Sequence, residues 1–212
     1  MEIRHLDFYC ERLAADFWAE PFNAISNAAF FMAGFWALYH SWKKSRGFGI
    51  FMSVLLLLVG VGSFLFHTFA DNRTHLLDLI PIFLFTMAYL FYSLRYYLKW
   101  SRLKSTIGLV VVIGLMVMSE IFVPKSFLNG SSLYFPPLVM MYYVAFQMNS
   151  LWYKRAAFVF TLSLMVRTFD ATLCEWISTG THFMWHILNA VTLSLLMKVY
   201  LDQDLRSSTA VH

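Results

Sequence analysis

Long runs of apolar residues alternate along this chain with short polar breaks. A helix of roughly 20 apolar residues spans the hydrocarbon of a bilayer, and the stretches between the breaks are of that length. They lie near residues 22–42, 48–70, 75–97, 105–123, 132–151, 156–176 and 182–201. Runs such as FMSVLLLLVG lack the apolar and polar alternation of a strand. The pattern predicts an all-α membrane protein, a bundle of seven transmembrane helices, because backbone groups in lipid must be satisfied within each segment.

Composition agrees with this pattern. Hydrophobic residues make up 59% of the 212 positions and charged residues 13%, and the mean hydropathy is +0.61. These values lie outside the range of soluble domains. No segment is typical of a linker or a repeat. We therefore expect one domain, with an acidic arm at residues 1–21, the bundle at 22–201 and a tail at 202–212.

The basic residues are divided unequally between the two ends of the predicted bundle. One end collects Lys43, Lys44, Arg46, Arg95, Lys99, Arg102, Lys104, Lys154, Arg155, Lys198 and Arg206. The other end has Arg4, Arg12, Arg73 and Lys125. The positive-inside rule then predicts an N-terminus that is outside or luminal and a cytosolic C-terminus. The net charge of +4 is explained by this topology, so we expect no nucleic-acid partner.

Ionisable side chains inside spanning segments are costly and are functional candidates. His67 precedes the end of the second segment, Asp78 follows the start of the third, and His182 and His186 open the seventh, all within roughly 7 Å of one membrane face. His182 and His186, like Ser63 and His67, are spaced i, i+4 and share a helical face. An isolated HxxxH pair is more often packing or interfacial. Three histidines that leave a fourth position open are the ligand set of a catalytic zinc, which we predict here.

Several motifs resemble those of one family. GSFLFH (62–67), LLDLIP (76–81) and THFMWH (181–186) are similar to the three motifs of alkaline ceramidases. Those enzymes belong to a superfamily of seven-helix hydrolases that includes the progestin and adipoQ receptors. YCER followed by WAEPFNAISN resembles the ceramidase branch, most closely its bacterial members. The similarity runs from about residue 7 to residue 200. It implies that His67, His182 and His186 hold zinc and that Ser63 and Asp78 complete the site.

Compatible roles follow from chemistry. Asp78 would take a proton from water and deliver it to the leaving amine, and Ser63 would donate a hydrogen bond to the oxyanion. Alternatively, Ser63 is the nucleophile or only a small residue that packs between helices. Asp78 could likewise serve only to stabilise the N-terminus of a helix. A site just below the membrane surface suits an acyl lipid.

The resemblance implies ceramide, whereas an ester lipid fits the same geometry, and a receptor-like protein with a structural zinc is the rival class. We expect a monomer, in a bacterial inner membrane rather than the ER or Golgi, with the site at the extracytoplasmic face.

The carboxylates before the first segment are candidates for calcium, since this region binds calcium in alkaline ceramidases. Carboxylates stand at Asp7, Glu11, Asp16 and Glu20. Glu11 and Glu20 match the family's positions best, and Asp7 and Asp16 less well. The pattern departs in its spacing, which is two residues shorter, and in an expected asparagine that appears as Arg12 or Leu13. The alternative is an acidic solvated arm.

Two further pairs complete the predictions. Cys10 and Cys174 both map to the outer face, where an oxidising compartment permits a disulfide. Relatives tie the arm down through a cysteine like Cys10, which favours the bridge over two free buried thiols. Arg167 and Asp170, three residues apart in the sixth segment, are expected to form an ion pair.

Overall fold

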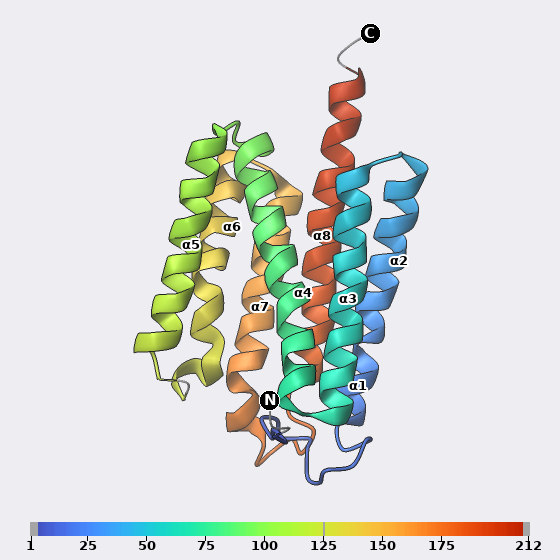
Figure 1. The fold of residues 1–212 in the computed structure, drawn as a ribbon, viewed down its shortest axis with the longest axis vertical. Coiled ribbons are helices and arrows are strands. Elements are labelled where there is room, and N and C mark those ends of the chain that lie inside the picture. The colour runs from blue at the N-terminus through green and yellow to red at the C-terminus, as the bar shows by residue number, and fades with distance from the viewer. Residues whose placement is uncertain (1–3, 125, 210–212) are drawn as a thin grey trace.

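The structure, a computed structural model, describes residues 4–124 and 126–209, with side chains as far as Asp202. Lys125, the side chain of Arg206 and the last three tail residues lie outside the described part. In chain order the helices are α1 (Pro21–Ser26), α2 (Ala28–Lys43), α3 (Gly47–Phe69), α4 (Asn72–Tyr92), the π-helical turn η1 (Ser93–Tyr97), α5 (Arg102–Phe122), the 3₁₀ segment η2 (Phe127–Tyr134), α6 (Phe135–Gln147), α7 (Leu151–Leu173) and α8 (His182–Thr209). The described residues are thus helical throughout (Figure 1), apart from loops and one β-bridge between His5 and Asp71.

Five helices of the described part are long and apolar enough to cross a membrane. They are Gly47–Phe69, Asn72–Tyr97, Arg102–Phe122, Leu151–Leu173 and His182–Asp202. The other two main helices are shorter, with 16 residues in α2 and 13 in α6, against the roughly 20 that a perpendicular span requires. The all-helical prediction is confirmed, and the five long helices indicate an integral membrane protein.

Several predicted segments have different boundaries in the structure, and three of them differ in how the helix is divided or where it ends. The segment at 22–42 is divided at Asn27 into α1 and α2, and that at 132–151 is η2 followed by α6. Pro136 and Pro137 lie in the first turn of α6, where the missing N–H groups leave no helical hydrogen bond unmade. The seventh helix was predicted to end at residue 201 but continues to Thr209, because the polar residues after 201 prolong α8 beyond its apolar part.

The bundle is built around α3 and α8. α3 packs between α2 and α4, while α8 packs against α7 and α2 and also contacts α3. Figure 1 shows α5 and α6 on the far side of α4 and α7 from α2. Met52, Leu56 and Val59 of α3 and Met197 of α8 are buried in the core between these helices. The arrangement brings the end of α3 and the start of α8 to the same end of the molecule.

The N-terminal arm, residues 4–20, crosses this end of the bundle (Figure 1). The backbone N–H of Leu6 donates to the Ala70 carbonyl at 2.7 Å, in the turn between α3 and α4. Asp71 in that turn begins α4 with a capping box, accepting from the N–H groups of Arg73 and Thr74. The arm is therefore attached to the end of the bundle at which the helices carry the candidate residues.

Candidate metal centre and active site

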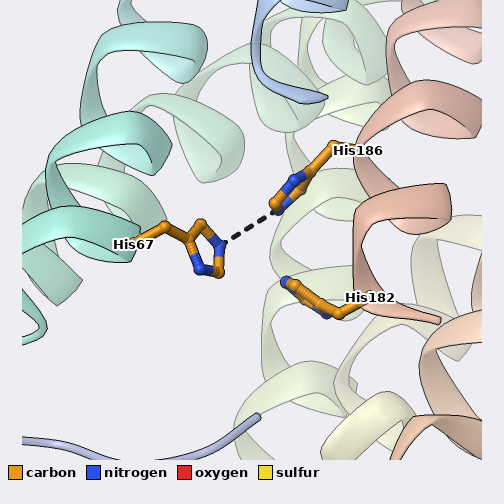
Figure 2. Close-up of side chains that lie close together, drawn as sticks. All are labelled: His67, His182 and His186. Carbon is orange, nitrogen blue, oxygen red and sulfur yellow. Dashed lines mark hydrogen bonds between the residues drawn. The ribbon is translucent and has the colours of Figure 1, made fainter. Parts of the chain in front are cut away.

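Three histidines converge at the end of the bundle covered by the arm. His67 lies in the last turn of α3, and His182 and His186 lie in the first two turns of α8. Figure 2 shows the His67 ring pointing across the gap between these helices toward the other two. One ring nitrogen from each residue lies within 4.8 Å of the others. All three side chains are buried, so the cluster can hold a metal ion shielded from water.

Hydrogen bonds orient two of the rings. Nδ1 of His67 lies 2.5 Å from Oε2 of Glu20, and Nδ1 of His186 lies 2.7 Å from Oγ of Ser26. A carboxylate accepts, so Nδ1 of His67 carries the proton. The Ser26 hydroxyl donates to the Asn23 carbonyl at 2.9 Å, so its oxygen is free to accept from Nδ1 of His186. Both Nε2 atoms are then left as lone pairs.

These two lone pairs face each other. Nε2 of His67 and Nε2 of His186 are 3.1 Å apart. Figure 2 draws this contact as a hydrogen bond, which requires a proton on one of the two Nε2 atoms. In the tautomers assigned above neither Nε2 carries a proton, and a cation between the two nitrogens would take its place. Two nitrogens bound tetrahedrally to one zinc at about 2.0–2.1 Å each stand about 3.3 Å apart. The donor set, the protonation pattern and the spacing therefore fit a zinc ion.

His182 is held by its backbone and by a stacked ring. The Asp170 carboxylate accepts from the backbone N–H groups of Thr181 at 2.6 Å and His182 at 2.9 Å, which caps the start of α8. The Tyr9 ring stacks on the imidazole, with centroids 3.8 Å apart. Burial raises the pKa of the Tyr9 phenol well above its ordinary value, so this ring is neutral. Nδ1 of His182 is buried and has no hydrogen-bond partner among the described residues.

A serine and an aspartate lie beside the histidines. The Ser63 hydroxyl is 3.4 Å from Nε2 of His186, and Asp78 lies close enough to Ser63 to interact with its hydroxyl. Oδ1 of Asp78 is buried and finds no hydrogen-bond partner in the part of the chain that the structure describes. A buried acceptor that finds no donor in the protein is costly, so Asp78 is available to a bound molecule.

A cavity of about 410 Å³ adjoins these groups. Ser63, Asp78, His182 and His186 line its polar part. Most of the remaining wall is apolar, with Phe, Leu, Ile, Met and Val side chains from α3 to α8. The wall of the cavity is thus mostly apolar, and the histidines of α8, Ser63 and Asp78 are among its polar groups.

The family model for ceramidases matches residues 6–209, which is nearly the whole chain. This chain belongs to the ceramidase family. The resemblance to alkaline ceramidases predicted from the motifs is confirmed, and the matched range includes every candidate residue from Asp7 to His186. Comparison with curated proteins and with solved structures gives no match.

The arm of this ceramidase-family chain is tied to the end of α7. Cys10 and Cys174 form a disulfide, with Cα atoms 5.4 Å apart. Gly180, with φ +61°, lies against this bridge, and a Cβ there would collide with Oδ1 of Asp170 and approach Cys10. Glycine at this position lets the arm, α7 and the start of α8 meet closely enough for Asp170 to reach His182.

The structure does not gather the arm carboxylates into a common ligand group. Glu11 accepts from the backbone N–H groups of Phe22 at 2.6 Å and Asn23 at 2.9 Å. Asp7 and Asp16 are exposed. Among the described residues, the three histidines alone form a cluster of His, Cys, Asp or Glu able to hold a metal.

Glu20 is shared between an arginine and a histidine. Oε1 receives the Arg12 Nε–H at 2.5 Å, and Oε2 receives Nδ1 of His67 and, at 2.9 Å, the Asn23 side-chain amide. Burial favours the neutral acid, but the hydrogen bonds from His67, Asn23 and Arg12 hold the pKa of Glu20 below its ordinary value. Glu20 is therefore an ionised partner of the histidine cluster.

The expected ion pair between Arg167 and Asp170 is wrong. Asp170 caps α8, as described above. The Arg167 guanidinium donates to the Asn129 carbonyl at 2.6 Å and to the Ser131 hydroxyl at 3.1 Å. Residues three apart on a helix can pair, but here each side chain bonds a neighbouring segment instead, Asp170 the start of α8 and Arg167 residues of η2.

Sequence reasoning missed Ser26 and Tyr9. Both contact the histidines from the N-terminal part of the chain, and Ser26 is separated from His186 by 160 residues. The stretch WAEPFNAISN, which contains Ser26, resembled the family and was the available signal. No spacing rule connects either residue to α8.

Proposed function

We propose that this protein is a zinc-dependent lipid amidase that hydrolyses the N-acyl bond of ceramide-like sphingolipids. Membership of the ceramidase family supports the reaction class. The observation that carries the proposal is the convergence of three buried histidines, with Nε2 of His67 and Nε2 of His186 3.1 Å apart, at a cavity that Asp78 also lines. The products would be a sphingoid base and a fatty acid.

His67, His182 and His186 are the proposed zinc ligands. Bound there, zinc would supply an acidified water and polarise the scissile carbonyl. Glu20 and Ser26 keep the protons of His67 and His186 on Nδ1, which leaves Nε2 free to bind. Burial of the three rings excludes competing solvent from the site.

Asp78 is proposed as the proton carrier and Ser63 as the donor to the oxyanion. Oδ1 of Asp78 is unpartnered at the cavity, so it can take a proton from water and pass it to the leaving amine nitrogen. Ser63 has one hydroxyl proton to offer, and its oxygen lies at the same end of the cavity. Donation to the developing negative charge would stabilise the transition state.

The cavity supports an acyl lipid as the substrate. Its polar groups would hold the amide, and a cavity of about 410 Å³ with a mostly apolar wall is suited to a hydrocarbon chain. An ester lipid presents the same carbonyl to the same groups. The family match favours the amide of ceramide.

A receptor-like protein braced by a structural zinc is the rival proposal. Structural zinc sites are closed by four protein ligands. Within the described residues the cluster has three histidines and no fourth His, Cys, Asp or Glu. This open ligand set favours catalysis.

We further propose that α2 and α6 cross the bilayer with the five longer helices, which gives seven crossings. Tilt or local thinning of the bilayer accommodates short helices. The charge asymmetry supports an extracytoplasmic arm and histidine cluster and a cytosolic C-terminus. The monomer and the bacterial inner membrane remain part of this proposal.

The proposal is tested with purified protein and a lipid panel. N-acyl sphingosines of several chain lengths, a phospholipid and a neutral ester lipid are incubated with the enzyme, and released fatty acid is measured with and without a zinc chelator. We expect release from N-acyl sphingosine that the chelator abolishes and added zinc restores. Fatty acid release from the ester lipids alone would change the proposed substrate from an amide to an ester. No chelator-sensitive release from any lipid would refute the enzymatic proposal.

A companion variant tests the ligands. His186→Ala removes one of the two facing Nε2 atoms and should lose both bound zinc and activity, measured by metal analysis of the purified protein. His40→Ala is the control, because His40 lies near the end of α2 remote from the arm. Unchanged zinc in His186→Ala would remove that residue from the site.

A further inference from the structure

Arg12 is a buried cation in the arm. Its side chain is 1% exposed and is fixed at three points. Nε donates to Oε1 of Glu20 at 2.5 Å, Nη1 to the Ala14 carbonyl at 3.3 Å and Nη2 to the His67 carbonyl at 2.9 Å. A buried charge is retained at such a place only when it is paired and hydrogen-bonded, and the arrangement meets both conditions.

The carboxylate oxygens of Glu11 and Glu20, the best candidate ligands for a divalent cation, already accept hydrogen bonds, which leaves the neutral Oδ1 of Asn23 beside them without a partner among the described residues. Both carboxylate oxygens of Glu11 accept backbone N–H groups at the start of α1, and both oxygens of Glu20 accept from Arg12, Asn23 and His67. Calcium takes 6–8 oxygen ligands. The guanidinium beside Glu20 would in addition repel a dication. The residues of the arm therefore do not fit calcium.

The guanidinium also holds His67 by two routes. The first runs through Glu20, whose second oxygen binds Nδ1 of the His67 ring. The second is direct, to the His67 carbonyl, which lies in the last turn of α3 and so has no N–H partner within the helix. The planar guanidinium of Arg12 thus contacts both the backbone of His67 and the Glu20 carboxylate that orients the His67 ring. A lysine has one compact ammonium group and cannot donate in this planar arrangement to both groups.

We propose that Arg12 is the permanent cation of the arm, which takes the place of a calcium ion and positions His67 through Glu20. The positioning role rests on the proposed zinc site, whereas the independence from calcium does not. The Cys10–Cys174 bridge, two residues before Arg12, anchors the arm against the end of α7. No exchangeable ion is then required to keep the arm on the histidine cluster.

The test compares the parent chain with Arg12→Asn, Arg12→Lys and a control, Arg102→Asn. Arg102 is exposed at the start of α5, at the opposite end of the bundle. Each purified protein is prepared in calcium-free buffer. The readouts are the thermal midpoint during a titration with calcium chloride, with magnesium chloride as reference, and the zinc dissociation constant measured by chelator competition.

The parent chain should show no midpoint shift with calcium beyond that with magnesium. Arg12→Asn should bind zinc about 10 to 100-fold more weakly, Arg12→Lys should fall between the two, and Arg102→Asn should match the parent. A calcium-specific rise in the parent midpoint would overturn the proposal, and this measurement stands even if Arg12→Asn does not fold. Parental zinc affinity in Arg12→Asn would also overturn it. If the parent chain does not hydrolyse lipid, the proposed function is contradicted. The thermal midpoint with calcium and the zinc dissociation constant can still be measured and still test the role of Arg12.

Discussion

Each histidine of the cluster depends on a different neighbour. Glu20 orients the ring of His67, Ser26 orients that of His186, and Asp170 holds the backbone of His182. Groups that hydrogen-bond to the second nitrogen of a ligand histidine fix its tautomer and its direction. The cluster is therefore assembled before an ion arrives, and little ordering remains to be done upon binding.

Ser26 provides a test of this preorganisation. Ser26→Ala removes the acceptor for Nδ1 of His186 without touching the three rings. We expect zinc affinity to fall about 10 to 100-fold, with a smaller loss of thermal stability than His186→Ala causes. Chelator competition measures the affinity. Ser53→Ala is the matched control, since the Ser53 hydroxyl bonds only the Gly49 carbonyl within α3. Equal affinities in the two serine variants would contradict the orienting role.

For individual residues, the sequence indicates the candidate ligands better than the residues that hydrogen-bond to them. The i, i+4 spacings identified Ser63, His67, His182 and His186, because residues at that spacing share a helix face. The supporting contacts join residues far apart in the chain, such as Ser26 and His186, and no local period encodes them. Glu20 was selected from the sequence, but its contact with His67 was visible only in three dimensions.

The contact between α3 and α4 brings Ser63 and Asp78 together. Pro81 lies inside α4 and has no N–H, so the carbonyl of Leu77 four residues earlier lacks its helical partner. Gly62 packs against that carbonyl, and a Cβ at position 62 would collide with it. The residues that follow these two contact points are Ser63 and Asp78. The glycine and the proline therefore set the distance between the two proposed catalytic groups.

Gly62→Ala should separate the two helices. The added methyl group overpacks the contact, at a cost of about 1–3 kcal/mol, and a shift of about 1 Å at the reacting groups reduces turnover by about 100-fold. Fatty acid release and the thermal midpoint are the measurements. Gly114→Ala in α5 is the control, because nothing lies within 4 Å of a Cβ at that position. Full activity in Gly62→Ala would show that the spacing between α3 and α4 is not critical.

The hydropathy pattern located the helices, but it placed the first residue of several helices three to five residues too late in the sequence. α4, α5 and α7 begin at Asn72, Arg102 and Leu151, whereas the apolar pattern suggested 75, 105 and 156. Their first turns contain charged residues or histidine, which lower the mean hydropathy of an apolar window. Asp71, Ser101 and Ser150 cap these helices with their side chains. These capping residues, read from the sequence, would have given the correct starts. At Asn27, where α1 ends and α2 begins, no side-chain cap marks the division.

The whole molecule is polarised along its long axis. The arm, the disulfide and the histidine cluster occupy one end, and the loops rich in lysine and arginine lie at the other (Figure 1). Disulfides persist in oxidising compartments, and basic loops remain in the cytosol. Both features favour the same orientation, with the arm outside.

Cysteine labelling tests this orientation in intact cells. Asp16→Cys places a thiol on the exposed arm, and Lys43→Cys places one at the exposed end of α2. The native cysteines are paired and do not compete for the label. A membrane-impermeant maleimide should label position 16 directly and position 43 only after permeabilisation. The reverse pattern would invert the proposed topology.

The order of elements along the chain has a consequence for biosynthesis. Two of the three histidines open α8, while Arg12, Glu20 and Ser26, which brace the cluster, come before α2. A ribosome that has not yet made residue 186 has therefore produced most of the protein without a complete binding site. Loading of the proposed metal would therefore follow insertion of α8, and a chain that terminates after α7 would keep the arm but lack two of the three proposed ligands.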